Sequence, residues 1–340
     1  MRIIGCDLHA RQQTIAMLDR DAGEFVEKTL EHDGGELQKF YSGLTRPVLV
    51  GIECRVGHPA KIRKAETRKQ KHDRRDARLL LTLLAENRFP TIWMPSSEQR
   101  DLRTLLRHRH QWVRLRSRVQ HTLQSMALNH GLRRGHSLWN RAGQHALRAL
   151  PLAPYASERR AALLTLYPRL QGSIDELDQE VWEEVHQHPQ ARRLLTHPGV
   201  GPITALATEV FLGDPMRFAD GKALASYIGM IPSEHSSGGR QRLGAMSKQG
   251  NALLRYLWCE AAMHAVGRDP ELKRFYRRKL VQKGLGKARV AAARKLGIRL
   301  WIMMRDQIDY QEFCRRGKAR QESGSVRAGM PDLDSGPAAQ

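Results

Sequence analysis

The first fifty residues constrain the fold most, because short strand-like runs separated by turns lead into one helical segment and one apolar run. Residues 2–8, 13–18 and 25–30 are rich in β-prone side chains and are separated by polar residues typical of turns. These runs predict a three-stranded meander. Residues 34–44 then have apolar side chains at a helical spacing, and residues 47–52 are almost wholly apolar. A helix that crosses to a buried strand predicts an α/β sheet.

Four carboxylates lie where this sheet would bring them together. Asp7 ends the first strand and Glu53 ends the apolar one, and the carboxyl ends of neighbouring strands are where such sheets form sites. Asp73 and Asp76 begin a helical run to about Glu86, and residues three apart share a helix face. Four converging carboxylates repel one another unless a cation such as Mg²⁺ or Mn²⁺ neutralises them. The alternative is that Asp73 and Asp76 only cap their helix.

The charge of the chain indicates a polyanionic partner. The 340 residues include 57 Lys and Arg against 35 Asp and Glu, and the net charge of +22 is spread along the chain. Nucleic acid is favoured over a membrane, because the chain has no run of about eighteen apolar residues. A basic segment before Asp73 suits a nucleic-acid backbone. Its cations are Lys61, Arg63, Lys64, Arg68, Lys69 and Lys71.

The cysteines and the first residues bear on the compartment. The four cysteines form no CxxC pair, so the sequence gives no sign of a disulfide framework or a zinc site and favours a reducing compartment. The first residues lack the basic and apolar regions of a signal peptide. We therefore expect the protein to stay in the cytoplasm.

Residues 91–190 predict a basic helical region. Apolar side chains over residues 102–126 recur mostly three and four apart, with Arg and His between them. A second helical stretch covers residues 157–185 and contains Pro168, which predicts a break or kink. We expect the two helices to pair as a coiled-coil-like hairpin around an irregular basic segment, whose Trp139 is available for stacking. The histidines of this region are interpreted as polar filler rather than metal ligands.

A glycine-containing turn lies in residues 194–205. This stretch predicts a helix, a Pro-Gly-Val-Gly turn and a second helix, which resembles a helix-hairpin-helix. Gly199 and Gly201 would let backbone amides approach a phosphate at a helix N-terminus without reading sequence. A tight structural hairpin remains the alternative.

A second loop, residues 232–250, combines four serines and a histidine with several glycines. Its backbone N–H groups, together with Arg240, Arg242 and Lys248, suit a phosphodiester held against a hydroxyl nucleophile. The alternative is a flexible polar loop that caps the helix expected from Asn251.

Three further helices are predicted after this loop, over residues 251–266, 269–279 and 283–305. Beyond residue 311 the chain loses its periodicity and becomes rich in Arg, Gly, Ser and Pro. Residues 311–340 are therefore expected to be a disordered tail.

Taken together and in order, these motifs resemble the DEDD transposases of insertion-sequence family 110, which are related to the Piv invertases. The resemblance covers residues 1 to about 310. The stretches that carry it are Gly-Cys-Asp-Leu-His ending at His9, Gly-Ile-Glu ending at Glu53, Lys71 to Ala77, the Pro-Gly-Val-Gly turn, Ser236-Ser237-Gly238, and Met246 to Asn251.

The resemblance implies three regions. These are an α/β RuvC-like (RNase H-like) domain over residues 1–90, a mainly α coiled-coil region over residues 91–190 and a mainly α transposase domain over residues 191–310. It implies an oligomeric, dimeric or tetrameric, recombinase that acts on donor and target DNA and is guided by an RNA encoded beside its gene.

The resemblance also assigns roles to residues. The implied ligands of Mg²⁺ are Asp7, Glu53, Asp73 and Asp76. Ser237, with Ser236 as the near alternative, would be the nucleophile that forms a 5′-phosphoserine intermediate. Because acids and serine lie in different domains, the resemblance implies a site completed between subunits.

The chain departs from the family pattern after Glu53. In the family a helix and another parallel strand follow, whereas here residues 54–59 follow directly and themselves read like that later strand. A parallel crossover needs a dozen or more residues. We therefore expect a helix and a strand to be missing at 53/54, an apolar face to be exposed, and recombination to be poor. Two other functions stay open: a decayed transposase that only binds nucleic acid, and a metal-only nuclease of the RuvC type.

Overall fold

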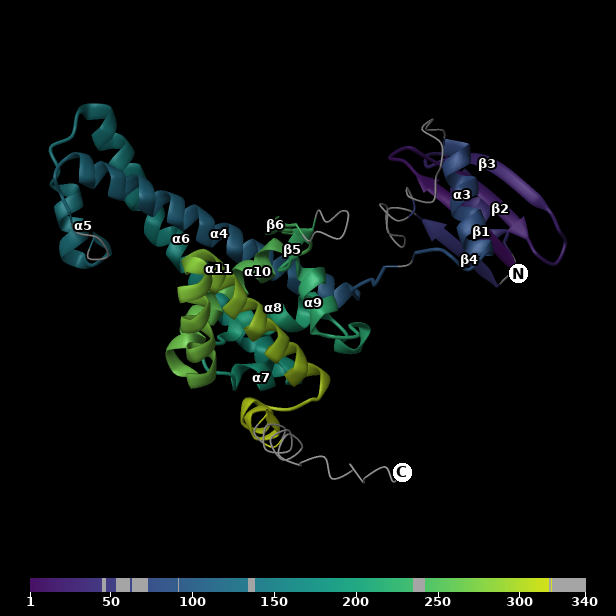
Figure 1. Cartoon of the computed structure of the whole chain (residues 1–340). Helices are drawn as coiled ribbons and strands as arrows, with labels where there is room; N and C mark the ends of the chain where they lie inside the picture. The colour runs from purple at the N-terminus through teal and green to yellow at the C-terminus, as the bar shows by residue number, and fades with distance from the viewer. Residues whose placement is uncertain are drawn as a thin grey trace, which may run out of the picture. The chain divides into compact units, whose positions relative to one another are not determined.

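The computed structural model describes residues 1–44, 47–52, 62, 73–90, 92–133, 138–234, 242–317 and 319. The chain divides into two compact units, residues 1–96 and 97–340, and Figure 1 labels most of their elements. None of the described helices is long and apolar enough to span a membrane.

The first unit contains a mixed four-stranded sheet in the order β3-β2-β1-β4. β1 (Arg2–Leu8), β2 (Gln12–Asp19) and β3 (Phe25–Glu31) form the antiparallel meander predicted from the sequence. α1 (Glu36–Ser42) then crosses to β4 (Val48–Ile52), which runs parallel to β1. The predicted α/β sheet is confirmed.

β4 is not the buried strand that its apolar composition predicts. It lies at the edge of the sheet as far as the described residues extend, and Leu49 is 43% exposed. The prediction was wrong because a strand paired on one side only has less of its surface covered than a central strand. Glu53 and the junction after it lie outside the described residues, so the missing helix and strand stay a prediction.

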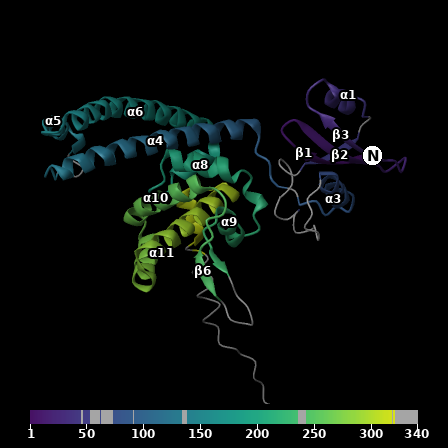
Figure 2. The same cartoon turned by 90° about the horizontal axis from the view of Figure 1, so that it is seen from above.

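Alternate side chains of β1 pack against two different helices. Ile4 and Cys6 are buried in a cluster that includes side chains of α1. Ile3 is buried against α3 (Asp73–Ala85), the helix predicted to begin at the paired acids. Figure 2 shows α1 and α3 on opposite faces of the sheet. Because side chains alternate along a strand, Asp7 is on the same face as Ile3, the face that α3 covers.

Gly5 allows the backbone of α3 to lie directly on β1. A Cβ atom at Gly5 would be 2.3 Å from the carbonyl oxygen of Ala77 and 2.5 Å from the amide nitrogen of Leu81. No side chain fits at such distances, so the helix reaches the strand only because residue 5 is glycine. This contact fixes the position of the first turn of α3 relative to the end of β1.

We predict that Gly5→Ala destabilises the first unit by about 1–3 kcal/mol, the usual cost of overpacking a core. Hydrogen exchange of the β1 and β2 amides in the full chain measures this loss as faster exchange. Gly43→Ala is the matched control, because a Cβ at Gly43 meets no atom closer than 3.4 Å and φ is −78° there. Equal, small effects of the two substitutions would contradict the close approach.

The second unit begins with a long helical hairpin. α4 (Ser97–Asn129) and α6 (Pro154–Gln187) pair antiparallel, as predicted. Arg109 near the start of α4 binds Asp178 near the end of α6. Further along, the Arg116 guanidinium donates to Gln171 Oε1 at 2.8 Å.

α6 contains Pro168 without a break, so of the predicted break or kink only the kink stays a prediction. The tip of the hairpin differs from the sequence prediction in two further ways. The segment expected to be irregular contains α5 (Arg141–Arg148), whose N-cap is Asn140. The ring of Trp139 stacks on Tyr167, with centroids 5.2 Å apart, so it packs inside the hairpin tip rather than being available for stacking.

The rest of the second unit is mainly helical. Its longer elements are α7 (Pro189–Leu195), α8 (Pro202–Leu212), α9 (Gly221–Ile228), α10 (Ala252–Arg268) and α11 (Pro270–Arg305). Gly284, with φ 76° and ψ 171°, interrupts α11 close to the gap between the two predicted helices.

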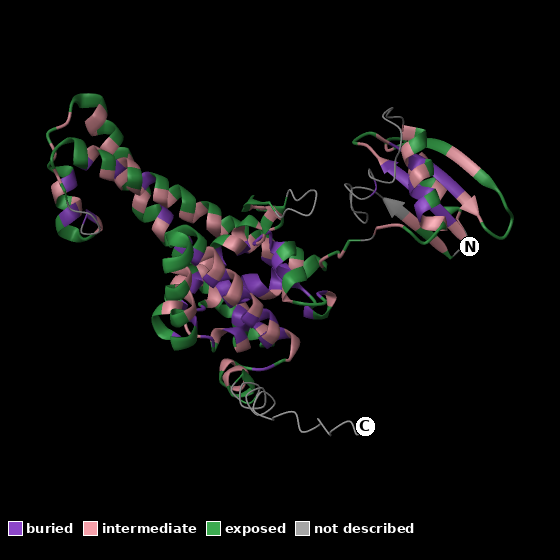
Figure 3. Cartoon of the chain, viewed as in Figure 1, coloured by how far each residue is buried: buried purple, intermediate pink, exposed green. Residues whose placement is uncertain are grey.

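Trp258 lies in the core of this unit, and Figure 3 shows buried residues gathered where its helices pack together. Trp258 Nε1 donates to Thr208 Oγ1 at 2.9 Å. A Cβ at Gly297 would be 2.1 Å from the Trp258 ring, so this glycine provides the space for the indole.

The start of the expected disordered tail is ordered instead. Residues 310–317 are helical, and Asp309 Oδ1 accepts a hydrogen bond from the Glu312 amide at 2.8 Å. Tyr310 donates its hydroxyl proton to buried Asp269 at 2.8 Å, and Phe313 packs against the core. These anchors explain why the prediction was wrong for residues 311–317. Residue 318 and residues 320–340 lie outside the described residues.

Candidate active site

Asp7, His9 and Asp73 form a compact group, called the acidic cluster below. His9 Nε2 lies 3.3 Å from Asp7 Oδ2 and 3.3 Å from Asp73 Oδ2. One ligand atom of each residue lies within 4.8 Å of the others. Asp7 is only 7% exposed, whereas the His9 and Asp73 side chains are 38% and 41% exposed. The cluster therefore has a buried carboxylate at its base and remains accessible from solvent.

Three local features position these side chains. The alternation of β1 turns Asp7 toward α3. His9 follows β1 in the turn to β2, where its amide donates to the Gln12 carbonyl at 2.9 Å. Asp73 is in the first turn of α3, which Gly5 holds against the strand.

The structure brings together two of the four predicted acids. Asp76 lies three residues further along, in the same first turn of α3, and is outside the acidic cluster. Glu53 is not described, but the parallel register pairs Cys6 with Ile52, the residue before it. The role of Glu53 therefore stays a prediction.

His9 is the member of the cluster that sequence reasoning missed. It stands in the same Gly-Cys-Asp-Leu-His motif as Asp7 and two residues beyond it. Residues two apart in an extended segment share a face, so this spacing was the available signal.

The serine-containing stretch joins two short strands that the sequence did not reveal. β5 (Pro232–Glu234) and β6 (Leu243–Met246) pair antiparallel. Ser236, Ser237 and Arg240 lie outside the described residues, and Arg242 and Lys248 are exposed beside them in the sequence. Residues 232–246 are called the serine hairpin below.

The base of the serine hairpin is held by close backbone contacts. Gly229 and Gly250 have φ 74° and 75°, and a Cβ at Gly229 would lie 2.0 Å from the Gln249 carbonyl oxygen. Arg255 Nη1 donates to the carbonyl oxygens of Ile228 at 2.9 Å and Gln249 at 2.6 Å. These contacts tie the hairpin to α9 and α10.

The capping interpretation is confirmed for Asn251. Its Oδ1 accepts the Leu254 amide at 3.0 Å at the start of α10. This cap explains why the predicted loop ends at Asn251. It does not test the role predicted for the serines of the loop.

In the glycine-containing turn before α8, the packing requires a glycine at position 199. Gly199 has φ 88°, and a Cβ there would be 2.3 Å from the Ala265 amide nitrogen, so the turn packs directly on α10. Gly201 is the N-cap of α8 and has open space around it.

Burial lowers the pKa of the adjacent His197 to about 4, so this imidazole is neutral. Phosphate binding at Gly199 and Gly201 stays a prediction.

The predicted basic track before Asp73 lies almost wholly outside the described residues. Its cations from Lys61 to Lys71 are not described, and Ile62 alone is, as a buried residue. Nucleic-acid binding by this track stays a prediction.

Comparisons with known proteins identify the family. Residues 191–277 match the family described as Transposase IS116/IS110/IS902, and residues 51–130 match the DEDD transposase family of IS110. A protein of Pseudomonas aeruginosa named probable family 20 transposase is 26% identical over 339 residues, covering 91% of this chain and 98% of that protein. The chain belongs to the IS110/IS116/IS902 family of transposases.

Two further relatives are similar to this transposase. The transposase of insertion sequence IS1111A from Coxiella burnetii is 26% identical over 276 residues, covering 77% of this chain and 74% of that protein. The pilin gene-inverting protein of Moraxella lacunata is 28% identical over 229 residues, covering 66% and 62%. The resemblance to DEDD transposases and Piv invertases noted from the sequence motifs is confirmed at the level of the family.

The acidic cluster of this transposase fits a divalent metal ion, as a DEDD nuclease region implies. Carboxylate oxygens from Asp7 and Asp73 suit Mg²⁺ and Mn²⁺. The imidazole of His9 adds a nitrogen ligand, which suits transition metals better than Mg²⁺. The donor set therefore favours Mn²⁺ over Mg²⁺ at equal concentration.

We predict that Mn²⁺ raises the melting temperature of the transposase, by an amount equivalent to about 2.7 kcal/mol at a hundred times the dissociation constant. Asp73→Asn should blunt this response, because it removes one charged ligand. Thermal melts with and without Mn²⁺ measure the difference, and Asp33→Asn, at an exposed acid of the same unit, is the matched control. Asparagine caps helices about as well as aspartate. An Asp73→Asn variant that responds to Mn²⁺ like the parent would support capping instead.

Proposed function

We propose that this transposase is a Mg²⁺- or Mn²⁺-dependent DNA recombinase of an insertion sequence that cuts and rejoins strands through Ser237. The convergence of Asp7 and Asp73 at the carboxyl end of β1 carries the proposal. In this reading Glu53 and Asp76 complete the metal ligands, and His9 contributes a nitrogen.

The residues have complementary roles in this chemistry. The metal, when bound, stabilises charge on the phosphoryl oxygens and on a serine alkoxide. Ser237 Oγ attacks the phosphorus and loses its proton, and the bond to the 3′ oxygen of the DNA strand breaks. The 3′ oxygen leaves with a proton, and the 5′ phosphate stays on the serine. Attack by another strand's 3′ hydroxyl reverses the step without a new energy source.

The serine hairpin supports this role because its base is held by close contacts and carries positive charge. Gly229, Gly250 and Arg255 fix both ends of the hairpin to α9 and α10. Arg242 and Lys248 bring positive charge to the same stretch, where a phosphate would be held.

The partners we propose are donor and target DNA, a guide RNA from the flanking element, and other copies of the chain in a dimer or tetramer. The net charge of +22 supports a polyanionic partner, and membership of a transposase family supports DNA. We place the protein in the cytoplasm, where such DNA is found in bacteria.

We further propose that this copy recombines poorly, because a helix and a strand are missing after Glu53. The 43% exposure of Leu49 on β4 supports an incompletely covered sheet. The recombination rate should rise when a family-like helix and strand are inserted after Glu53. Full activity of the chain as it stands would contradict this.

We predict that Ser237→Ala abolishes the covalent protein–DNA adduct while leaving DNA affinity nearly unchanged, since many cations carry binding. Labelled paired DNA substrates, with RNA from the flanking element, are incubated with Mn²⁺ and analysed on denaturing gels. Ser236→Ala is the matched control and should still form the adduct.

Each alternative has its own outcome in this assay. Adduct formed by Ser237→Ala but not by Ser236→Ala would move the nucleophile by one residue. Metal-dependent nicking without an adduct would indicate a metal-only nuclease. Binding without nicking or adduct would indicate a decayed transposase.

A further inference from the structure

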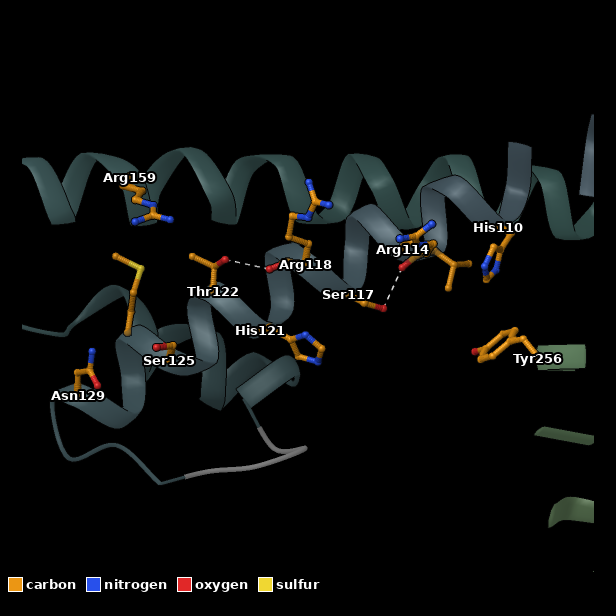
Figure 4. A pocket seen from close by; sticks show the side chains of 12 residues that line it. His110, Arg114, Ser117, Arg118, His121, Thr122, Ser125, Asn129, Arg159 and Tyr256 are labelled. Atoms are coloured by element: carbon orange, nitrogen blue, oxygen red, sulfur yellow. Dashed lines mark hydrogen bonds between the residues drawn. The ribbon is translucent and has the colours of Figure 1, made fainter. Parts of the chain in front are cut away.

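A groove of about 840 Å³ runs along α4 in the second unit. Figure 4 shows its side chains: most project from successive turns of α4, Arg159 comes from α6, and Tyr256 comes from α10. The side chains on α4 include His110, Arg114, Arg118, Thr122, Ser125 and Asn129. Among the described residues, neither the acidic cluster nor the serine hairpin contributes to this groove.

The groove presents polar groups at a regular repeat. Arg114, Arg118 and Thr122 are four residues apart, so they follow one face of the helix about 6 Å apart. That repeat is of the same order as the distance between successive phosphates along one nucleic-acid strand. The Thr122 hydroxyl donates to the Arg118 carbonyl oxygen at 2.9 Å, so the groups that this face offers to a backbone are the two guanidinium groups.

The positive charge of the groove is not compensated nearby. Residues 111–172 contain ten arginines, no lysine and a single acidic residue, Glu158. No carboxylate of the described residues pairs with Arg114, Arg118 or Arg159, whereas Arg109, nearer the base of the hairpin, binds Asp178. An arginine face without acids attracts phosphate from a distance and can bind it through paired donors.

The pKa of His110 at one end of the groove is lowered by burial and by the nearby arginines. Burial lowers the pKa of His110, and the charges of Arg114 and Arg109 lower it further. The imidazole lies beside the ring of Tyr256, with centroids 5.2 Å apart and planes at 47°. Tyr256 is 45% exposed and closes one end of the groove with a hydroxyl group available to a ligand.

The groove and the serine hairpin share one helix. Arg255 of α10 binds the carbonyl oxygens at the base of the hairpin, and the next residue, Tyr256, lines the groove. A polymer bound along α4 would thus meet the helix that holds the serine hairpin in place.

We propose that this face of α4, with Arg159 and Tyr256, is a binding groove for the phosphate backbone of duplex DNA. The choice of DNA rests on the proposed function, because transposases act on DNA. Binding through the groove is independent of sequence, because the proposed contacts are to phosphates, which carry no sequence information. The groove positions the DNA that the serine hairpin cuts.

The test uses the full chain and a labelled DNA duplex of unrelated sequence, with affinity measured by fluorescence anisotropy from low to physiological salt. Arg114→Gln/Arg118→Gln should weaken binding about tenfold or more and reduce the salt slope by about two, because two phosphate contacts are lost. Arg114→Lys/Arg118→Lys keeps the charge and should retain most of the slope.

The matched control is Arg268→Gln/Arg277→Gln, which removes the same charge from exposed positions on α10 and α11 outside the groove. It should leave the salt slope nearly unchanged. Equal effects of the groove and control variants would overturn the groove. A duplex RNA that binds the parent more tightly than DNA, and loses more affinity in the groove variant, would overturn DNA as its occupant.

The experiments can disprove the groove and the proposed function independently of each other. If the phosphoserine adduct forms normally but the salt slope of Arg114→Gln/Arg118→Gln is unchanged, only the groove proposal is contradicted. If the groove variant has a reduced salt slope but the parent never forms the adduct, the serine mechanism is contradicted and the groove proposal is supported.

Discussion

The direct contact between α3 and β1 is the constraint on which the candidate metal centre depends. Gly5 lets the carbonyl of Ala77 approach a position where any side chain would collide. The helix starts only four residues before Ala77, so its first turn lies beside the end of β1. Without that approach, the carboxylate of Asp73 would not reach His9, and the buried Asp7 would lack its neighbour on α3.

The second unit holds the serine hairpin by the same means, backbone against backbone. Gly229 and Gly250 allow the ends of the serine hairpin to pack closely, and Arg255 holds their carbonyl groups. A base held by several contacts suits the proposed nucleophile, because positioning lowers the barrier to reaction. In the proposed function, the groove with Arg114 and Arg118 adds a DNA-binding face to α4, so the elements proposed to cut and to hold DNA are neighbours in one unit.

Much of this arrangement could be predicted, and the failures have physical reasons. The strands of the meander, the crossing to β4, and the facing of Asp7 and Asp73 follow from side-chain alternation and helical spacing. His9 escaped prediction because a histidine in a turn has many ordinary roles. β5 and β6 escaped because Pro-Ser-Glu and Leu-Gly-Ala-Met carry no strand periodicity. The helix at 310–317 depends on Tyr310 reaching buried Asp269, a distant contact that local composition does not show.

The central claim is that Asp7, His9 and Asp73 bind one divalent metal ion. Free Mn²⁺ can be counted directly by its electron paramagnetic resonance signal as the full chain is added. We predict saturable binding in the parent, loss of that binding in Asp7→Asn, and weaker binding in His9→Ala, while Asp33→Asn binds like the parent. Undiminished Mn²⁺ binding by Asp7→Asn would contradict the account.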